Sequence, residues 1–287
     1  PWLDGIGRGT FPNVLGKIAK AVAFATAPTN LDPKGGRKPA MICRQTAVKE
    51  VSTHPWRVLG GSSRASISTK TSESLEGIPD GSIDLILTDP PYFDNLSYSE
   101  LSDFYLAWHQ SLGMAEPPYD NPAIAAPIKE NLALTDRGDQ SIEVYRNSLH
   151  RIFCECRRVL KKDGIMVFTY HHKSPVAWGA LGDALVRSGL KCATVMPLRG
   201  EGQGGLHSYN GTIKWDAVFV CRKGNQVPSA SSDNVAVPRT VVKQAKQQAS
   251  AYAEDLGKTR QIGFRDPDRL NLERAMIVAS AVIAPTH

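Results

Sequence analysis

An acid, two prolines and an aromatic residue follow a short apolar run in the first half of the chain. The run from Ile83 to Thr88 leads directly into Asp89-Pro-Pro-Tyr92. A short apolar run of this length predicts a buried strand. In open α/β sheets, ligands bind beyond the carboxyl ends of the strands. The sequence therefore predicts that Asp89 stands at the ligand-binding edge of a sheet.

The two prolines make Asp89 and Pro90 a pair of fixed hydrogen-bond acceptors. Each proline fixes its own φ, lacks an N–H group and restricts the residue before it, so the chain leaves the strand along one stiff path. The Asp89 carboxylate and the Pro90 carbonyl then match the two hydrogens of an aromatic NH2 group. Acceptors placed in advance make its delocalised nitrogen a better nucleophile. The predicted chemistry is alkylation of an exocyclic amine, with Asp89 orienting and polarising the amine rather than acting as a strong base.

Tyr92 supplies a platform on which the ring bearing that amine can stack, and Phe93 a second wall. An amine inside a duplex is reached only when its base swings out of the stack, and stacking then returns about 1–3 kcal/mol. The alternative is that Asp89-Pro-Pro-Tyr92 is merely a rigid turn. Glu116-Pro-Pro-Tyr119 is an example of such a turn, because it follows Gly113-Met-Ala and not an apolar strand. The strand before Asp89 favours chemistry over a simple turn.

The pattern around this segment predicts an α/β fold. Short apolar runs alternate with amphipathic stretches, which is typical of β-α-β units and a mostly parallel sheet. We expect strands at 57–60, 83–88, 165–170, 192–197 and 217–221, and helices at 101–112, 145–160 and 177–187. Lys161-Lys-Asp-Gly164 is expected to end the second of these helices, and Ser188-Gly189 the third.

Composition divides the chain into three parts. Residues 1–56 form a basic lead-in segment with one helix at 13–27, residues 57–223 form the core, and residues 224–287 form a linker and two helices at 241–256 and 268–283. The net charge is +6, and residues 1–60 hold nine Lys and Arg against three Asp and Glu. Such a cluster suits a phosphate backbone, although a solvated surface explains it equally well.

Five scattered cysteines without a CxxC pair predict neither a disulfide framework nor a zinc ribbon, and they favour a reducing cytoplasm. No apolar run is long enough to span a membrane. Because the chain begins Pro-Trp and shows no leader, it reads as a fragment of a longer protein.

Asp89, Pro90, Pro91 and Tyr92 match the [DNS]-P-P-[YFW] motif of the amino-methyltransferases that act on nucleic acids. The longer run from Thr88 to Trp108 resembles large bacterial adenine-specific DNA methylases that contain a zinc ribbon. This resemblance extends over about 56–223 and includes Thr169-Tyr-His-His-Lys173 and the run from Trp215 to Lys223. It implies a Rossmann-like fold, S-adenosylmethionine as cofactor, DNA as substrate and a restriction or defence protein as partner.

The chain departs from these families at the cofactor turn. They bind the cofactor through Asp/Asn-Pro-Phe-x-Gly-x-Gly after the first strand, and this turn is not in the sequence. Gly5-Ile-Gly-Arg-Gly9 is the nearest glycine cluster, and no apolar strand precedes it. We expect the first strands, the turn and the ribbon to lie upstream in a longer parent protein. The chain alone is then expected to bind the cofactor weakly.

Further candidates lie at the ends of other strands. Gly60, Gly61 and Ser62 match a loop that borders the cofactor in relatives, although two glycines after a strand also suit a plain turn. His171 and His172 either contact the substrate base or form a polar strand end. They are not a metal pair, because neighbours on a strand point to opposite faces. Glu201, with Arg199 and His207, suits a flexible surface loop better than a nucleic-acid contact.

Together these observations predict an S-adenosylmethionine-dependent adenine methyltransferase fragment that lacks its N-terminal strands. The catalytic residues are Asp89, Pro90, Pro91 and Tyr92, the base pocket adds Phe93, His171 and His172, and Asp89, Gly60, Gly61 and Ser62 contact the cofactor. No metal is expected. Asp in the first motif position favours adenine, while cytosine, RNA, a protein glutamine amide and a non-catalytic binding remnant stay open.

Overall fold

The computed structural model describes residues 11–26, 29–31, 37–39, 50–52, 64–66, 71–93, 107–108, 111, 140–200, 212–224, 237–260 and 262–283. The chain divides into two compact units, Pro1–Thr69 and Lys70–His287. The second unit includes both C-terminal helices as well as the sheet. The boundaries placed at 56/57 and 223/224 from the sequence stay predictions.

The described residues of the first unit form one helix and two pairs of short strands. Helix α1 confirms the helix predicted at 13–27, and its exposed side includes Leu15, Ile18 and Val22. Strands β1 and β2 pair antiparallel, and β3 and β4 pair parallel. The bounds are α1 Phe11–Thr26, β1 Thr29–Leu31, β2 Arg37–Pro39, β3 Glu50–Ser52 and β4 Arg64–Ser66. The strand expected at 57–60 lies outside the described residues.

The second unit is built on a four-stranded sheet with the order β5-β6-β8-β7 in the described part of the chain. Its strands are β5 Ile83–Thr88, β6 Leu160–Tyr170, β7 Leu190–Arg199 and β8 Trp215–Lys223. β5 and β6 are parallel, whereas β8 runs antiparallel to both β6 and β7. β5, β6 and β7 therefore run in one direction, as expected of a mostly parallel sheet, and β8 alone of the four described strands runs the other way. Antiparallel neighbours need no crossover helix, and none is described between β7 and β8.

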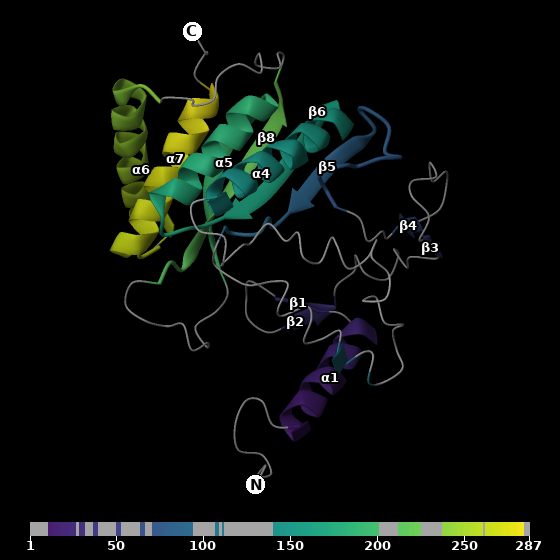
Figure 1. Cartoon of the computed structure of the whole chain (residues 1–287). Coiled ribbons are helices and arrows are strands. Elements are labelled where there is room, and N and C mark those ends of the chain that lie inside the picture. The colour runs from purple at the N-terminus through teal and green to yellow at the C-terminus, as the bar shows by residue number, and fades with distance from the viewer. Residues whose placement is uncertain are drawn as a thin grey trace. The chain divides into compact units, whose positions relative to one another are not determined.

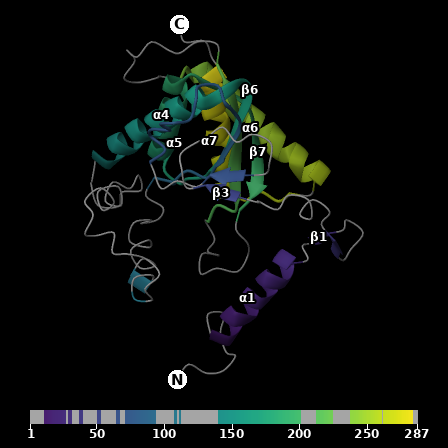
Figure 2. The same ribbon diagram turned by 90° about the vertical axis from the view of Figure 1, so that its right-hand side faces the viewer.

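Four described helices accompany this sheet, and Figure 1 shows them side by side in the order α6, α7, α5 and α4. Their bounds are α4 Gln140–Val159, α5 Pro175–Ser188, α6 Arg239–Arg260 and α7 Asp266–Ile283. Figure 2 shows the same unit turned by 90°. Within the described residues, no helix has both the length and the apolar character needed to cross a bilayer.

Helix α5 starts and stops where its sequence signals stand. The Ser174 hydroxyl accepts a hydrogen bond from the Val176 amide at 3.2 Å, and Pro175 occupies the first turn. Gly189 ends the helix with φ of 74°, a left-handed conformation that glycine adopts without steric cost. The stop predicted at Ser188-Gly189 is confirmed.

The prediction that Lys161-Lys-Asp-Gly164 ends the preceding helix was wrong. α4 ends at Val159, and Lys161-Lys-Asp-Gly164 belongs to the start of β6. There Ile83 pairs with Leu160 and Leu85 with Ile165, so these four residues form an irregular insertion in the ladder. Of the helix predicted at 101–112, the structure describes only Ala107, Trp108 and Ser111, all helical.

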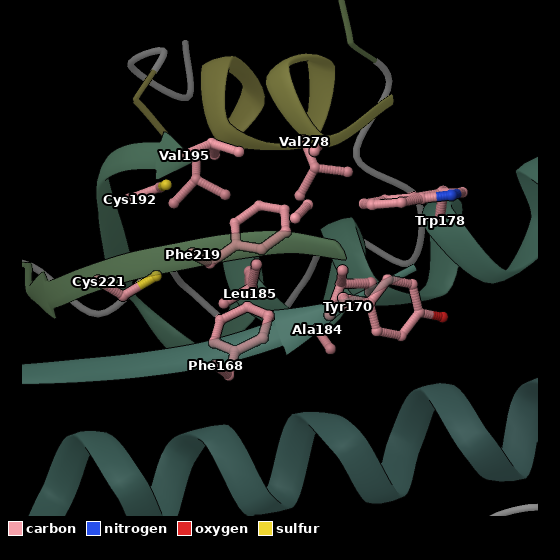
Figure 3. Packing of buried hydrophobic residues seen from close by; sticks show 14 of the residues in the cluster. Phe168, Tyr170, Trp178, Ala184, Leu185, Cys192, Val195, Phe219, Cys221 and Val278 are labelled. Carbon is pink, nitrogen blue, oxygen red and sulfur yellow. The ribbon is translucent and has the colours of Figure 1, made fainter. Parts of the chain in front are cut away.

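Aromatic residues fill the core between the sheet and its helices. The rings of Phe168 and Phe219 stack with centroids 4.8 Å apart and an interplanar angle of 2°. Figure 3 shows this pair with Leu185 of α5 and Val278 of α7 beside it. Both phenylalanines are fully buried. This core holds the strands whose ends form the candidate site.

Strand β5 has the predicted bounds, but the prediction that it is buried was wrong. Leu85 is 57% exposed and Leu87 is 74% exposed. β5 has only β6 as a neighbour among the described strands, so its other edge carries no described strand. Ile86, which points to the opposite face, packs against the core. The strand is therefore anchored along one face and one edge.

Candidate functional site

The strand register brings three strand ends to one edge of the sheet. Thr88 of β5 pairs with Phe168 of the parallel strand β6, so Asp89 follows beside Thr169. β8 runs the other way and pairs Ala217 with Tyr170, which places Asp216 level with His171. Residues two apart on a strand share a face. Asp89, Thr169, His171 and Asp216 therefore gather on one face at this edge.

Asp89 is exposed, and two hydroxyl groups hold one of its carboxylate oxygens. Oδ1 accepts hydrogen bonds from the Tyr92 hydroxyl at 2.6 Å and from the Thr169 hydroxyl. Within the described residues, Oδ2 and the Pro90 carbonyl accept no hydrogen bond. The carboxylate is thus fixed through one oxygen, and the other remains available for a ligand.

Tyr92 is more deeply buried than its predicted role as a stacking platform requires. The residue is only 9% exposed. The centroid of its ring lies 5.2 Å from that of Tyr170 and 4.6 Å from that of His171, both in edge-to-face arrangements. Burial raises the pKa of Tyr92 well above its usual value, and the hydrogen bond to Asp89 raises it further. A base can stack on this ring only after the side chain rotates away from Asp89.

The turn after β5 is fixed by α4. The hydroxyl of Tyr145, a fully buried residue of α4, donates to the Pro91 carbonyl at 2.9 Å. Phe93 has φ of 40° and packs on the Tyr145 ring at 5.2 Å. Positive φ at a bulky residue costs about 1–3 kcal/mol and persists only where neighbours impose it. Pro90 is buried in the same turn. The path of the chain is therefore held from both sides.

The two histidines expected in the base pocket point to different surroundings. His171 Nδ1 lies 2.5 Å from Asp216 Oδ1 at the sheet edge. His172 is buried, and its Nδ1 accepts a hydrogen bond from the Ser174 amide at 2.9 Å. Its ring also lies 6.1 Å from that of Phe93. His171 belongs to the candidate site, whereas His172 joins the end of β6 to the start of α5.

Sequence reasoning gave no role to Thr169, Asp216 or Tyr145. Thr169 and Asp216 lie in the runs that carry the family resemblance, but only the register of β5, β6 and β8 shows that they meet Asp89 and His171. Tyr145 appeared only as a member of a helical stripe. Its hydroxyl contact with Pro91 had no signal in the sequence, because the two residues lie 54 positions apart.

The expected cofactor loop, Gly60, Gly61 and Ser62, lies outside the described residues, as do Glu201 and His207. Asp89 is the one member of the expected cofactor set whose surroundings are known. In the described part of the chain, no group of three or more His, Cys, Asp or Glu side chains is arranged to hold a metal ion.

Comparisons with known proteins give a remote likeness. No protein-family model and no curated protein sequence matches the chain. Among solved structures, the chain is similar to the selenomethionine crystal structure of a proposed DNA modification methylase from Thermus thermophilus. The identity is 12%, the TM-score is 0.31, and the match covers 71% of this chain and 73% of the other.

Proposed function

We propose that this chain is the base-binding part of a methyltransferase that modifies the exocyclic amino group of adenine in DNA. One observation carries the proposal. Asp89 stands exposed at the carboxyl end of β5, with Oδ1 held by two hydroxyls and with Oδ2 and the Pro90 carbonyl accepting no hydrogen bond from the described residues. An aromatic NH2 group requires two acceptors, and Asp89 and Pro90 are neighbours in the chain.

The residues at this edge act on the amine by orientation. Asp89 Oδ2 and the Pro90 carbonyl each accept one N–H, which draws electron density back onto the nitrogen and favours a pyramidal geometry. Because the Thr169 hydroxyl holds Oδ1, the carboxylate does not reorient as the base arrives. The proton that the amine loses on methylation leaves during or after the transfer, and Asp89 is the nearest acceptor.

Tyr92 must exchange one partner for another when a base enters. Leaving Asp89 costs the Tyr92 hydroxyl a hydrogen bond to a charged group, which is worth about 1.5–3 kcal/mol. Stacking of an extruded base on the freed ring returns about 1–3 kcal/mol. The two terms nearly balance, and the contacts that the ring loses with Tyr170 and His171 are a further cost of the rotation. Tyr92 then supports the base from its flat side, with Phe93 and His171 as neighbours of the pocket.

S-adenosylmethionine supplies the methyl group when it is bound. We propose that Asp89, an exposed acid at the carboxyl end of β5, also lies beside the bound cofactor. Gly60, Gly61 and Ser62 complete the proposed cofactor contacts. We propose a Rossmann-like methyltransferase fold whose first strands and glycine-rich turn are supplied by an upstream segment. A cytoplasmic location and a restriction or defence partner belong to the same proposal.

Labelled cofactor and DNA test this function directly. The chain is incubated alone, and also fused to an upstream segment that carries a glycine-rich cofactor turn, and the DNA is digested to nucleosides. Label in N6-methyladenine that disappears in Asp89→Ala is the expected result. Glu116→Ala is the matched control, since it changes the acid of the second Pro-Pro-Tyr sequence, and it should keep the label. DNA binding without label in either form would show a non-catalytic remnant, and label in cytosine would correct the target base.

A further inference from the structure

A second candidate binding site lies among the helices of the second unit. Figure 1 shows α7, α5 and α4 next to one another, and a cavity of about 530 Å³ lies among these three helices. This volume is in the range of small-molecule sites, which are mostly apolar with a few placed polar groups. The apolar side chains that line the cavity include Ile142, Val176, Trp178, Val186, Ile277 and Val278. The cavity therefore has the size and the walls of a small-molecule site.

Two glycines of α5 leave space in this cavity. Gly179 and Gly182 both line it. A Cβ added at Gly179 meets no atom within 4 Å, and one added at Gly182 meets only the Val278 side chain, at 3.5 Å. Glycine lowers the stability of a helix relative to alanine, and the packing of the protein requires it at neither position. The missing side chains leave room for a ligand.

The wall also contains a cation without an acidic partner. Arg274 of α7 lines the cavity and forms no ion pair with the described residues. Its Nη1 atom donates to the carbonyls of His172 and Lys173 at 3.4 and 2.6 Å. The neighbouring acid, Glu273, pairs with Lys246 at 2.8 Å instead. Burial lowers the pKa of Arg274, and the Glu273 charge opposes this only in part. The guanidinium has therefore lost some of its hydration without gaining a counter-ion.

One edge of this guanidinium is open to a ligand. Arg274 Nε and Nη2 make no hydrogen bond with the described residues. In the described part of the chain, the buried side-chain nitrogens that lack a hydrogen bond belong to Arg146 and Arg157, so Nε and Nη2 of Arg274 keep accessible surface. These two N–H groups form a planar fork that matches the two oxygens of a carboxylate. Arg274 can hold a carboxylate along this edge while Nη1 keeps its bonds to the backbone.

The other charged groups in the wall neutralise one another. The Glu143 carboxylate accepts a hydrogen bond from Arg146 Nη2. Asp183 accepts from Arg187 at 3.1 Å, and Arg146 Nε lies 3.8 Å from the same oxygen. Two acids and two cations thus form a balanced network, and Arg274 is the remaining charge among the lining residues. An anion gains from entering such a cavity, whereas a cation does not.

We propose that this cavity binds a small carboxylic acid with an apolar body, in its anionic form. The two carboxylate oxygens accept from Arg274 Nε and Nη2, and the apolar body covers the walls. A small inorganic anion would pair with Arg274 but would leave the apolar walls in contact with water. None of the lining residues belongs to the edge that contains Asp89, so this site does not depend on the proposed methyl transfer.

Three matched probes test the site on the whole chain by titration calorimetry. 2-Naphthoate carries the apolar body and the charge, 2-naphthamide has the same shape without the charge, and acetate has the charge without the body. We expect 2-naphthoate to bind with a stoichiometry of one, and the amide and acetate each to bind at least about 5-fold more weakly. No binding of 2-naphthoate up to its solubility limit overturns the proposal. Equal affinity of 2-naphthoate and either other probe overturns it as well.

The Arg274→Gln variant tests the role of the charge. We expect it to weaken 2-naphthoate binding at least about 5-fold, to the level of the amide, and to change amide binding by less than about 2-fold. Damage to the fold would weaken both probes alike, so the difference between them is specific to the charge. Arg269→Gln, at an exposed arginine of the same helix outside the cavity, is the matched control and should bind as the wild type does. Equal loss of both probes in Arg274→Gln, or no loss of either, contradicts the assignment.

Cavity-filling variants locate the binding. The side chain of Gly179→Leu enters open space in the cavity, and we expect it to weaken 2-naphthoate binding at least about 10-fold. Ala281→Phe fills the same cavity from α7 and is the second variant. Gly16→Leu, at another helical glycine with open space, is the control. Circular dichroism checks the folding of each variant, and unchanged binding in a folded cavity variant would refute the site.

Discussion

The Tyr92→Phe variant tests whether the Tyr92 hydroxyl holds Asp89. At pH 8 the substitution removes one hydrogen bond of 2.6 Å to a carboxylate and a weaker one of 3.2 Å to Thr169. A hydrogen bond to a charged group is worth about 1.5–3 kcal/mol. Asp89 is exposed, so water replaces part of the loss. We therefore expect the variant to be less stable by about 1 kcal/mol.

The difference between the two proteins should reverse in alkali. The pKa of Tyr92 in the folded chain lies above its ordinary value of 10.0, because burial opposes the phenolate. Between these two pKa values the unfolded chain releases the Tyr92 proton and the folded chain keeps it. The wild type therefore loses stability as the pH rises above 10, by at most about 1.4 kcal/mol per pH unit for this one group. An advantage of about 1 kcal/mol then disappears near pH 11.

Urea unfolding at pH 8, 10 and 11, followed by tryptophan fluorescence, measures both effects. The free energy of unfolding of the variant should lie below that of the wild type at pH 8 and meet it near pH 11, with equal m-values. Tyr252→Phe is the control, because that hydroxyl makes no hydrogen bond with the described residues, and it should change stability by less than about 0.5 kcal/mol at pH 8. Parallel curves for wild type and Tyr92→Phe from pH 8 to 11 would show that the hydroxyl is not buried against Asp89.

Two further substitutions test the framework of the site. Arg158→Ala removes hydrogen bonds to the Leu75 and Ile78 carbonyls of 3.0 and 2.9 Å, and it should cost about 1–2 kcal/mol after allowance for partial exposure. Hydrogen exchange should then speed up in 75–82, whereas Arg222→Ala at the exposed end of β8 leaves it unchanged. Phe219→Ala deletes a fully buried ring stacked on Phe168 and should cost about 3–5 kcal/mol in urea unfolding, and a cost below about 1 kcal/mol would contradict the described packing.

The sequence predicted where most elements of the second unit lie. Apolar runs bounded by glycine or polar residues located β5 to the residue, and Ser188-Gly189 located the end of α5, because strand runs and left-handed glycine caps are local signals. The ends of β6, β7 and β8 extended beyond their apolar centres. The ladder includes polar residues such as Lys223 and Arg199 that a hydrophobic run does not mark.

Strand direction and burial were not readable from the same signals. β7 and β8 have the apolar runs of parallel strands, yet they pair antiparallel. β5 reads as buried on both faces, but Leu87 is largely exposed. An apolar run records which side chains favour burial, while the number of neighbours depends on the rest of the fold. The sequence therefore shows which side chains favour burial, and the structure shows which of them are buried.

In the candidate site too, local sequence signals predicted some features, and others depend on tertiary contacts. The apolar run that ends at Thr88 predicted that Asp89 stands at a strand end, and the prolines predicted the stiff path after it, so the position of the acid followed from local signals. No such restriction governs the Tyr92 side chain, whose position depends on Tyr170, His171 and the Thr169 hydroxyl. Those contacts require the register of β6 against β5. A rigid motif therefore specifies where the acid stands, whereas the tertiary neighbours decide whether its aromatic residue faces a ligand or hydrogen-bonds to that acid.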